Sequence, residues 1–202
     1  MISAVVLAAG RATRFGSTKQ LVEIDGKPLV QHAIDIAAGA GLDEIVVVLG
    51  HDAERVEAAL ELPERARLIF NGRFAEGQST SLAAGLRALD PSSDAAVVLL
   101  GDQPHIKPEE IRALVERFRS TGTTIVRLRY RDRPGPALLA REIWPDALAL
   151  SGDVGARALV DGQLVQEVSI DRDAPPDIDS LEDVSHSARP DSTGSPPGAK
   201  TR

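Results

Sequence analysis

Three uninterrupted apolar runs, each reaching a glycine, mark the first half of the chain. They are "AVVLAAG" at residues 4–10, "EIVVVLG" at residues 44–50 and "AAVVLLGD" at residues 95–102. Runs without polar alternation are typical of strands buried on both faces, as in parallel sheets. The pattern therefore predicts three inner strands of a parallel sheet.

The segments between these runs have the spacing of amphipathic helices. We expect helices from about Pro28 to 39, from 52 or 53 to 60, from 79 to 89 and from 108 to 119. Alternating strands and helices require right-handed crossovers, which bring the loops after the strands to one edge of the sheet, where ligands bind. The prediction is an α/β fold: a single domain with a mostly parallel open sheet and helices on both faces.

The pattern is less regular after Thr123. Residues 124–130 ("TIVRLRY") alternate like a strand, 133–139 ("RPGPALL") turn and re-enter the fold, and 141–150 and 154–160 resemble short helices. From His186 the chain is rich in Ser, Pro and Gly. We expect one domain over residues 1–185 and a disordered tail over 186–202.

Composition narrows the function classes. The chain has 202 residues, 43% hydrophobic and 3% aromatic residues, no Cys and a net charge of -7. An acidic chain with few aromatics is a poor nucleic-acid partner, and without Cys it forms no disulfide or thiolate metal site. Its first ten residues lack the basic start and length of a signal peptide or membrane span. We expect a cytoplasmic protein with no nucleic-acid or membrane partner.

The loop after the first run is basic although the chain is acidic. Arg11, Arg14 and Lys19 occur before the first acidic residue, Glu23. The loop matches neither the Walker A pattern nor GxGxxG. Small residues allow close backbone approach to a ligand, and three cations suit a triphosphate. The alternative is a solvated basic loop.

"LAAGRATRFGSTKQL" resembles the opening signature of the MobA-like nucleotidyltransferases, most closely the molybdenum cofactor cytidylyltransferase branch. Five further resembling motifs follow in order: "IDGKPLVQHAI", Asn71 with "EGQSTSLAAGL", "GDQP", "SGDVGARAL" and "DIDSLEDV". The resemblance implies a Rossmann-like nucleotidyltransferase fold and a Mg²⁺-dependent transfer of CMP from CTP to the terminal phosphate of molybdopterin, releasing pyrophosphate.

The resemblance also implies roles for individual residues. Lys19, Arg11 and Arg14 would act on the phosphates, and Ala9 would favour CTP over GTP. The candidate nucleotide-binding residues are Leu7, Ala8, Ala9, Gly10, Asn71, Gly77, Ser79 and Ser81. Ser79 and Ser81 have an alternative role at a helix start.

Asp102 is the first candidate metal ligand, because it ends the most apolar run, and a carboxylate there faces the ligand crevice. The alternative is an ordinary turn before Pro104. Asp179 is the second candidate, by the resemblance. Ser180 and Asp183 have capping-box spacing, so Asp179 has the alternative of lying at a helix entry. The four His residues are far apart and suggest no zinc spacing.

The acceptor end departs from the family pattern, because "RPGPALL" lacks the histidine of the usual Pro-Gly-His-Pro turn. Asp153 and Arg157 are candidates for the acceptor pocket, with helix capping and solvation as alternatives. Expected partners are CTP, a molybdopterin-type acceptor, and a molybdenum hydroxylase apoenzyme or its chaperone. Two other hypotheses stay open: an enzyme using GTP or activating another phosphorylated metabolite, and a non-catalytic cofactor-delivery protein.

Overall fold

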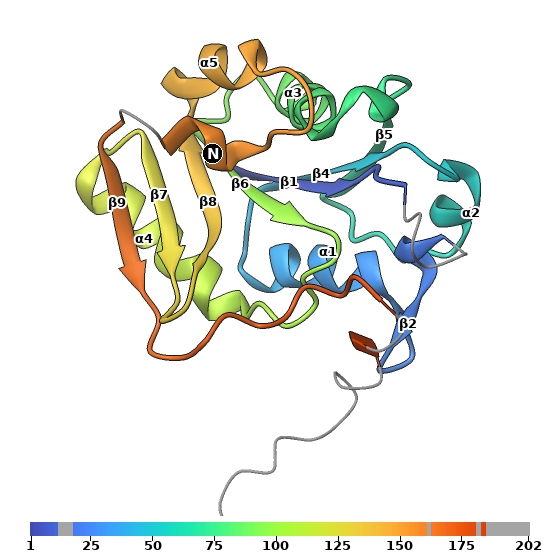
Figure 1. The fold of residues 1–202 in the computed structure, drawn as a ribbon. Helices are drawn as coiled ribbons and strands as arrows, with labels where there is room; N and C mark the ends of the chain where they lie inside the picture. The colour runs from blue at the N-terminus through green and yellow to red at the C-terminus, as the bar shows by residue number, and fades with distance from the viewer. Residues whose placement is uncertain (12–17, 161–162, 181–182, 185–202) are drawn as a thin grey trace, which may run out of the picture.

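A seven-stranded sheet forms the centre of the computed structural model, which describes residues 1–11, 18–160, 163–180 and 183–184 (Figure 1). Arg14 and the predicted tail lie outside the described residues. The strand order is β5-β4-β1-β6-β8-β7-β9. These strands are β1 (Ile2–Ala8), β4 (Glu44–Leu49), β5 (Ala66–Phe70), β6 (Ala95–Leu100), β7 (Ile125–Arg129), β8 (Pro134–Ala140) and β9 (Val165–Ser169), and a separate hairpin pairs β2 (Glu23–Ile24) with β3 (Lys27–Pro28).

The sheet is mostly parallel, which confirms the predicted fold class. Strands β5, β4, β1 and β6 pair in parallel, and so do β7 and β9. Within the described seven-stranded sheet, β8 alone runs antiparallel to both of its neighbours. The chain therefore reverses once, beyond β6.

Helices cover both faces of the sheet (Figure 1). They are α1 (Leu29–Gly39), α2 (Ala53–Ala58), α3 (Gln78–Ala88), α4 (Pro108–Thr121) and α5 (Trp144–Ala149). Residues alternate along β1, so that Ala4 and Val6 join the core beside α1 and α4, and Val5 and Leu7 join the core beside α3 and α5. Burial of a strand on both faces is the reason for its uninterrupted apolar sequence.

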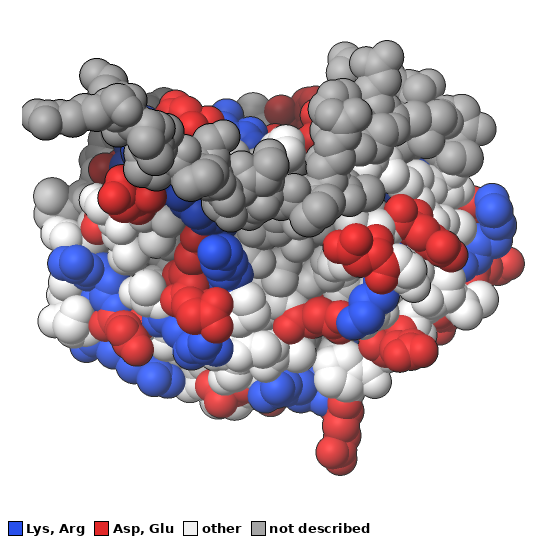
Figure 2. Space-filling model, turned by 90° about the horizontal axis from the view of Figure 1, so that it is seen from below, with Lys and Arg blue, Asp and Glu red and all other residues white. Residues whose placement is uncertain are grey.

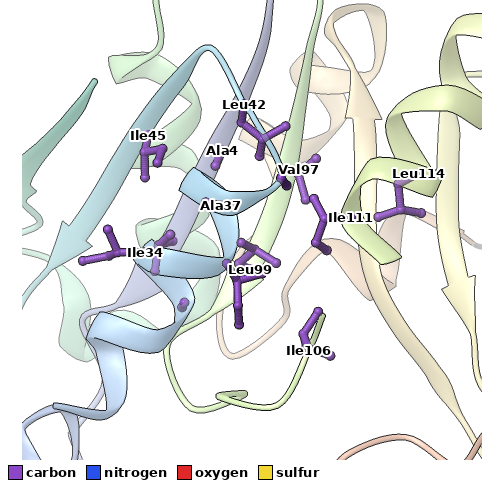
Figure 3. Packing of buried hydrophobic residues seen from close by; sticks show 14 of the residues in the cluster. Ala4, Ile34, Ala37, Leu42, Ile45, Val97, Leu99, Ile106, Ile111 and Leu114 are labelled. Carbon is purple, nitrogen blue, oxygen red and sulfur yellow. The ribbon is translucent and has the colours of Figure 1, made fainter. Parts of the chain in front are cut away.

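The core beneath the sheet is built from aliphatic side chains. Figure 3 shows Ile34 and Ala37 of α1 and Ile111 of α4 with Val97 and Leu99 of β6, all of them buried. On the other face, α3 lies very close to β1, since a Cβ on Gly85 would come within 2.3 Å of a methyl of Val5. A glycine at this position lets the helix approach the strand.

Four strands were not predicted: the two edge strands β5 and β9, and the short hairpin strands β2 and β3. "ARLIF" and "VQEVS" mix polar and apolar residues and are half-exposed because each lies at an edge of the sheet. Such segments give neither an apolar run nor a clean alternation. The expected short helix over 154–160 is a 3-10 helix, Ala156–Val160.

The surface seen from below Figure 1 carries both signs of charge. Figure 2 shows Lys and Arg interspersed with Asp and Glu over the described part of this face, without a continuous basic field there. None of the described helices is long and apolar enough to cross a membrane.

Candidate active site

A cavity of about 600 Å³ opens where β1 and β6 end. The turn after β1 lines it with Leu7, Ala8, Ala9, Gly10 and Arg11, and the end of β6 lines it with Leu100, Gly101 and Asp102. The chain leads from β1 to β4 and from β6 to β7, in opposite directions along the sheet, and open α/β sheets bind ligands at such a switch point. The structure thus brings the basic loop and the apolar run ending in Asp102 to one place.

Hydrogen bonds hold the turn after β1 on several sides. The Leu7 carbonyl accepts from the Gly101 N–H at 2.9 Å, and the Ala9 carbonyl accepts from the His51 N–H at 3.2 Å. The Gln20 amide donates to the carbonyls of Ala8 and Gly10. Four successive carbonyls are therefore fixed by groups from three other segments.

Lys19 lies between the two predicted metal ligands. Its Nζ is 2.9 Å from Oδ2 of Asp102 and 2.7 Å from Oδ1 of Asp179. Its side chain is 15% exposed. Burial opposes its charge, but the two carboxylates outweigh burial and raise the pKa of Lys19 above its ordinary value. Lys19 is an ammonium ion held by both acids.

Asp102 has one carboxylate oxygen that no described group satisfies. Oδ1 is buried without a hydrogen-bond partner, while Oδ2 accepts from Lys19. Burial raises the pKa of the Asp102 carboxyl, and Lys19 only partly offsets this. Two carboxylates with one ammonium leave an excess negative charge beside an unpaired oxygen, which suits a hard divalent cation.

The site provides few protein ligands for such a cation. Within the described residues, no group of three or more His, Cys, Asp or Glu side chains is placed to hold a metal. A divalent ion bound by Asp102 and Asp179 would take its other ligands from water and from nucleotide phosphates, as Mg²⁺ commonly does.

The segment "DIDSLEDV" divides its acids between the site and the local fold. Asp183 accepts from the N–H groups of Asp179 and Ser180 and from the Ser180 hydroxyl, as a capping arrangement requires. The carboxylate of Asp179 takes no part in that arrangement and contacts Lys19 instead. Asp177 is held by Arg133 at 2.8 Å and by Gln103 at 2.8 Å. Asp179 is therefore the acid of this segment that contacts Lys19.

The predicted nucleotide-binding residues between Asn71 and Ser81 lie partly in the cavity wall. Gly77 and Ser81 line the cavity. The buried Asn71 amide donates to the hydroxyls of Thr80 and Ser81, and Ser79 donates to the Gly152 carbonyl at 2.8 Å. Asn71 and Ser79 are not among the lining residues, and α3 begins after Gly77 without a side-chain cap. The serines thus make tertiary contacts rather than cap the helix.

A second cavity, of about 640 Å³, adjoins the first. It contains both predicted acceptor residues, Asp153 and Arg157, and the "RPGPALL" turn lines it through residues 134–137. The residues common to both cavities are Leu7, Gln78, Leu100 and Asp153. Two ligands bound in these cavities would share a wall.

Phe74 and Gln20 line the first cavity but were not predicted from the sequence. The Arg11 guanidinium lies 5.3 Å from the ring centre of Phe74, whose other neighbour is His51 in an edge-on contact at 6.3 Å. The sequence feature that could have identified Gln20 is its position directly after Lys19. It was missed because the side chain is uncharged.

Residues 4–168 match the MobA-like NTP transferase domain, so the chain belongs to this nucleotidyltransferase family. Among curated relatives, the bifunctional protein GlmU of Cutibacterium acnes is 36% identical over 147 residues, covering 70% of this chain. The match covers 35% of GlmU, so the chain spans about a third of that relative.

Two solved structures are similar over nearly the whole chain. Rv0371c from Mycobacterium tuberculosis H37Rv is 31% identical, with a TM-score of 0.82 over 93% of this chain and 97% of that one. Rv0371c has also been solved in complex with manganese. A nucleotidyl transferase from Methanothermobacter thermautotroptrophicus (Mth528) is 28% identical, with a TM-score of 0.78 over 92% and 95% of the two chains.

Proposed function

We propose that this nucleotidyltransferase transfers CMP from CTP to the terminal phosphate of a molybdopterin-type acceptor. The acceptor phosphate oxygen forms a bond to the α-phosphorus of CTP, and the bond from that phosphorus to the β-phosphate oxygen breaks, releasing pyrophosphate. The observation that carries the proposal is Lys19 held between Asp102 and Asp179 beside the cavity at the ends of β1 and β6.

The reaction needs positioning and charge neutralisation more than a general base, because a phosphate nucleophile is already ionised at neutral pH. Lys19 and Arg11 would neutralise the triphosphate, and Arg14 is proposed for the same task. Asp102 and Asp179 would hold Mg²⁺. When bound, Mg²⁺ would offset the charge that develops on the leaving pyrophosphate.

The turn after β1 would read the base through its backbone. Leu7 to Gly10, with Gly77 and Ser81, line the cavity. Asn71 would act from behind by holding the Ser81 hydroxyl at 3.0 Å, and Ser79 by fixing the segment at Gly152. Ala9 favours CTP in this proposal because a methyl group there leaves less room than glycine.

The second cavity would hold the acceptor. Its shared wall with the first cavity would place an acceptor phosphate beside the nucleotide, with Arg157 to bind that phosphate and Asp153 at the boundary. The proposed protein partner is a molybdenum hydroxylase apoenzyme or its chaperone, which would receive the product. The proposed compartment is the cytoplasm.

The test is pyrophosphate release with each of the four NTPs and Mg²⁺, with and without a molybdopterin-type acceptor. The proposal expects release that requires CTP and the acceptor together. Release with GTP instead would overturn the base assignment. Binding of a nucleotide without turnover of any acceptor would favour a cofactor-delivery protein.

A second candidate differs in the acceptor alone. The turn that departs from the family pattern lines the second cavity through Gly135 and Pro136, so the departure changes the acceptor side and leaves the nucleotide side intact. In this candidate the acceptor is another phosphorylated metabolite, such as a sugar phosphate. Pyrophosphate release from CTP with a sugar phosphate, but not with molybdopterin, would establish it.

A further inference from the structure

Three consecutive residues tie together the loops that follow three neighbouring strands. The Thr18 hydroxyl donates to Asp52 in the loop after β4, and Lys19 contacts Asp102 after β6. The Gln20 side chain donates to the turn after β1. The short 3-10 helix Lys19–Leu21 points these adjacent side chains in different directions. One short segment thus connects the loops of β4, β1 and β6.

Gln20 makes the contact with the turn that lines the nucleotide cavity. Its Nε2 is 3.1 Å from the Ala8 carbonyl and 2.8 Å from the Gly10 carbonyl, so one amide group spans the turn. The residue is 8% exposed. Its Oε1 is buried with no hydrogen-bond partner among the described residues. An unpaired buried acceptor carries a cost in stability, although the two hydrogen bonds that Gln20 donates are stabilising.

We propose that Gln20 is a positioning residue that sets the geometry of the base-reading turn and thereby the base preference of the enzyme. A trans peptide unit is planar, and its N–H points opposite to its C=O. By holding the carbonyls of Ala8 and Gly10, Gln20 therefore fixes the directions of the N–H groups of Ala9 and Arg11. These donors belong to the loop proposed to receive the nucleotide, so the inference rests on the proposed nucleotide site.

The chain offers a matched control for this role. Gln31 in α1 is also buried, and its Nε2 donates to Asp35 and to the Glu61 carbonyl, each at 2.9 Å. Gln31 lines neither cavity. Replacing either glutamine by Met keeps the approximate volume and removes its side-chain hydrogen bonds, two for Gln20 and three for Gln31, which also accepts from the Glu61 N–H at 2.9 Å. The two variants differ in whether those bonds hold the cavity turn.

The experiment measures the affinities of CTP, GTP and UTP by calorimetry, with Mg²⁺ present, for the unmodified full chain, Gln20→Met and Gln31→Met. We expect Gln20→Met to bind CTP at least about tenfold more weakly, because small displacements of a binding group have large effects. We also expect the ratio of CTP to GTP affinity to move toward one. Gln31→Met should lower the melting temperature and leave the affinities and the ratio within about twofold, since it acts away from the cavity.

A second variant replaces the attraction to the two carbonyls by repulsion. Gln20→Glu keeps the shape of the side chain and replaces the donating group by a carboxylate oxygen, which the two carbonyls repel, so it should lose the same base preference. Unchanged CTP affinity and an unchanged ratio in a folded Gln20 variant would overturn the inference and leave the proposed function intact. If the unmodified protein bound no nucleotide, the proposed function would fall, and this inference with it.

Discussion

The two adjoining cavities are built from different kinds of chain. The first lies at the ends of the buried strands β1 and β6, and hydrogen-bonded backbone forms much of its wall. The second is lined by the antiparallel strand β8 and by the irregular segment from Asp153 to Val160. Strand β1, at the first cavity, has neighbouring strands on both sides, whereas a 3-10 helix and the loop before it complete the wall of the second cavity.

This difference would allow the fold to keep the proposed nucleotide site while the proposed acceptor site changes. A turn fixed through four carbonyls tolerates little change, because each shift breaks a hydrogen bond. A wall made of exposed side chains such as Arg157 can change without disturbing the sheet. The sequence departs from the family pattern in the wall of the second cavity and matches it in the wall of the first. This agrees with the expectation that the second wall changes more readily.

The largest effect is expected from Lys19→Met, which alters the first cavity alone. Turnover should fall by about 10²–10³, the usual loss when one preorganised charge is removed from a transition state. The nucleotide-free variant should nevertheless bind Mn²⁺ more tightly, because Asp102 and Asp179 lose their internal cation. Pyrophosphate release and Mn²⁺ titration by electron paramagnetic resonance measure the two effects.

Lys27→Met is the matched control for that variant. Lys27 contacts Asp35 at 2.5 Å, and neither residue lines a cavity. This control should leave both turnover and Mn²⁺ affinity unchanged. Unaltered Mn²⁺ affinity in Lys19→Met would show that Lys19 does not compete with the metal.

Arg157→Ala should separate the two cavities. The KM for the acceptor should rise by about tenfold, the value of one charged hydrogen bond, while the dissociation constant of CTP stays unchanged. Initial rates at varied acceptor concentration, with calorimetry for CTP, test this. Arg129→Ala is the control, since Arg129 is exposed on β7 and lines neither cavity. A weaker affinity for CTP in Arg157→Ala would mean that the cavities are not independent.

Ala9→Gly should reduce the preference for CTP over GTP by about fivefold, near the low end for one methyl group in a packed pocket. The effect is small because the Ala9 methyl already packs against Gly50: a Cβ added to Gly50 would come within 2.8 Å of the Ala9 Cβ. Competition binding of CTP and GTP measures the ratio. A GTP preference in the unmodified protein would contradict the cytidylyltransferase assignment and leave the fold untouched.

Asp179→Asn should have the smallest effect, weakening Mn²⁺ binding by about threefold, because exposed charges contribute little. The Asp179 side chain is 61% exposed, compared with 30% for Asp102. Thermal stability should stay unchanged, since Ser180 and Asp183 retain their own hydrogen bonds. If Asp102→Asn, measured in the same titration, weakened Mn²⁺ binding no more than Asp179→Asn, the exposed acid would contribute as much to the metal site as the less exposed one.

The inner strands predicted from the sequence are those whose residues are nearly all buried. β1, β4 and β6 are buried on both faces and therefore read as apolar runs. The edge strands β5 and β9 have mixed surroundings, with half-buried and exposed residues along each strand. Their sequences therefore give neither an apolar run nor a clean alternation, which is why these two strands were missed.

The candidate site was predictable where charge identified it. Lys19 and Asp102 were predicted separately, and the structure joins them at 2.9 Å. Only the structure could show whether Asp179 contacts Lys19 or belongs to the capping arrangement, because both features occur within the same few residues. Gln20 was missed because its importance comes from the two carbonyls it contacts, and carbonyls are present at every residue.

The contact between Lys19 and Asp179 also has a consequence during synthesis. The two residues are 160 positions apart. At translation rates of about 5–20 residues per second, Asp179 follows Lys19 out of the ribosome by roughly 8–30 s. During that interval the nascent chain lacks the last acid of the proposed cation site. The proposed site is therefore complete only when almost the whole described chain has been translated.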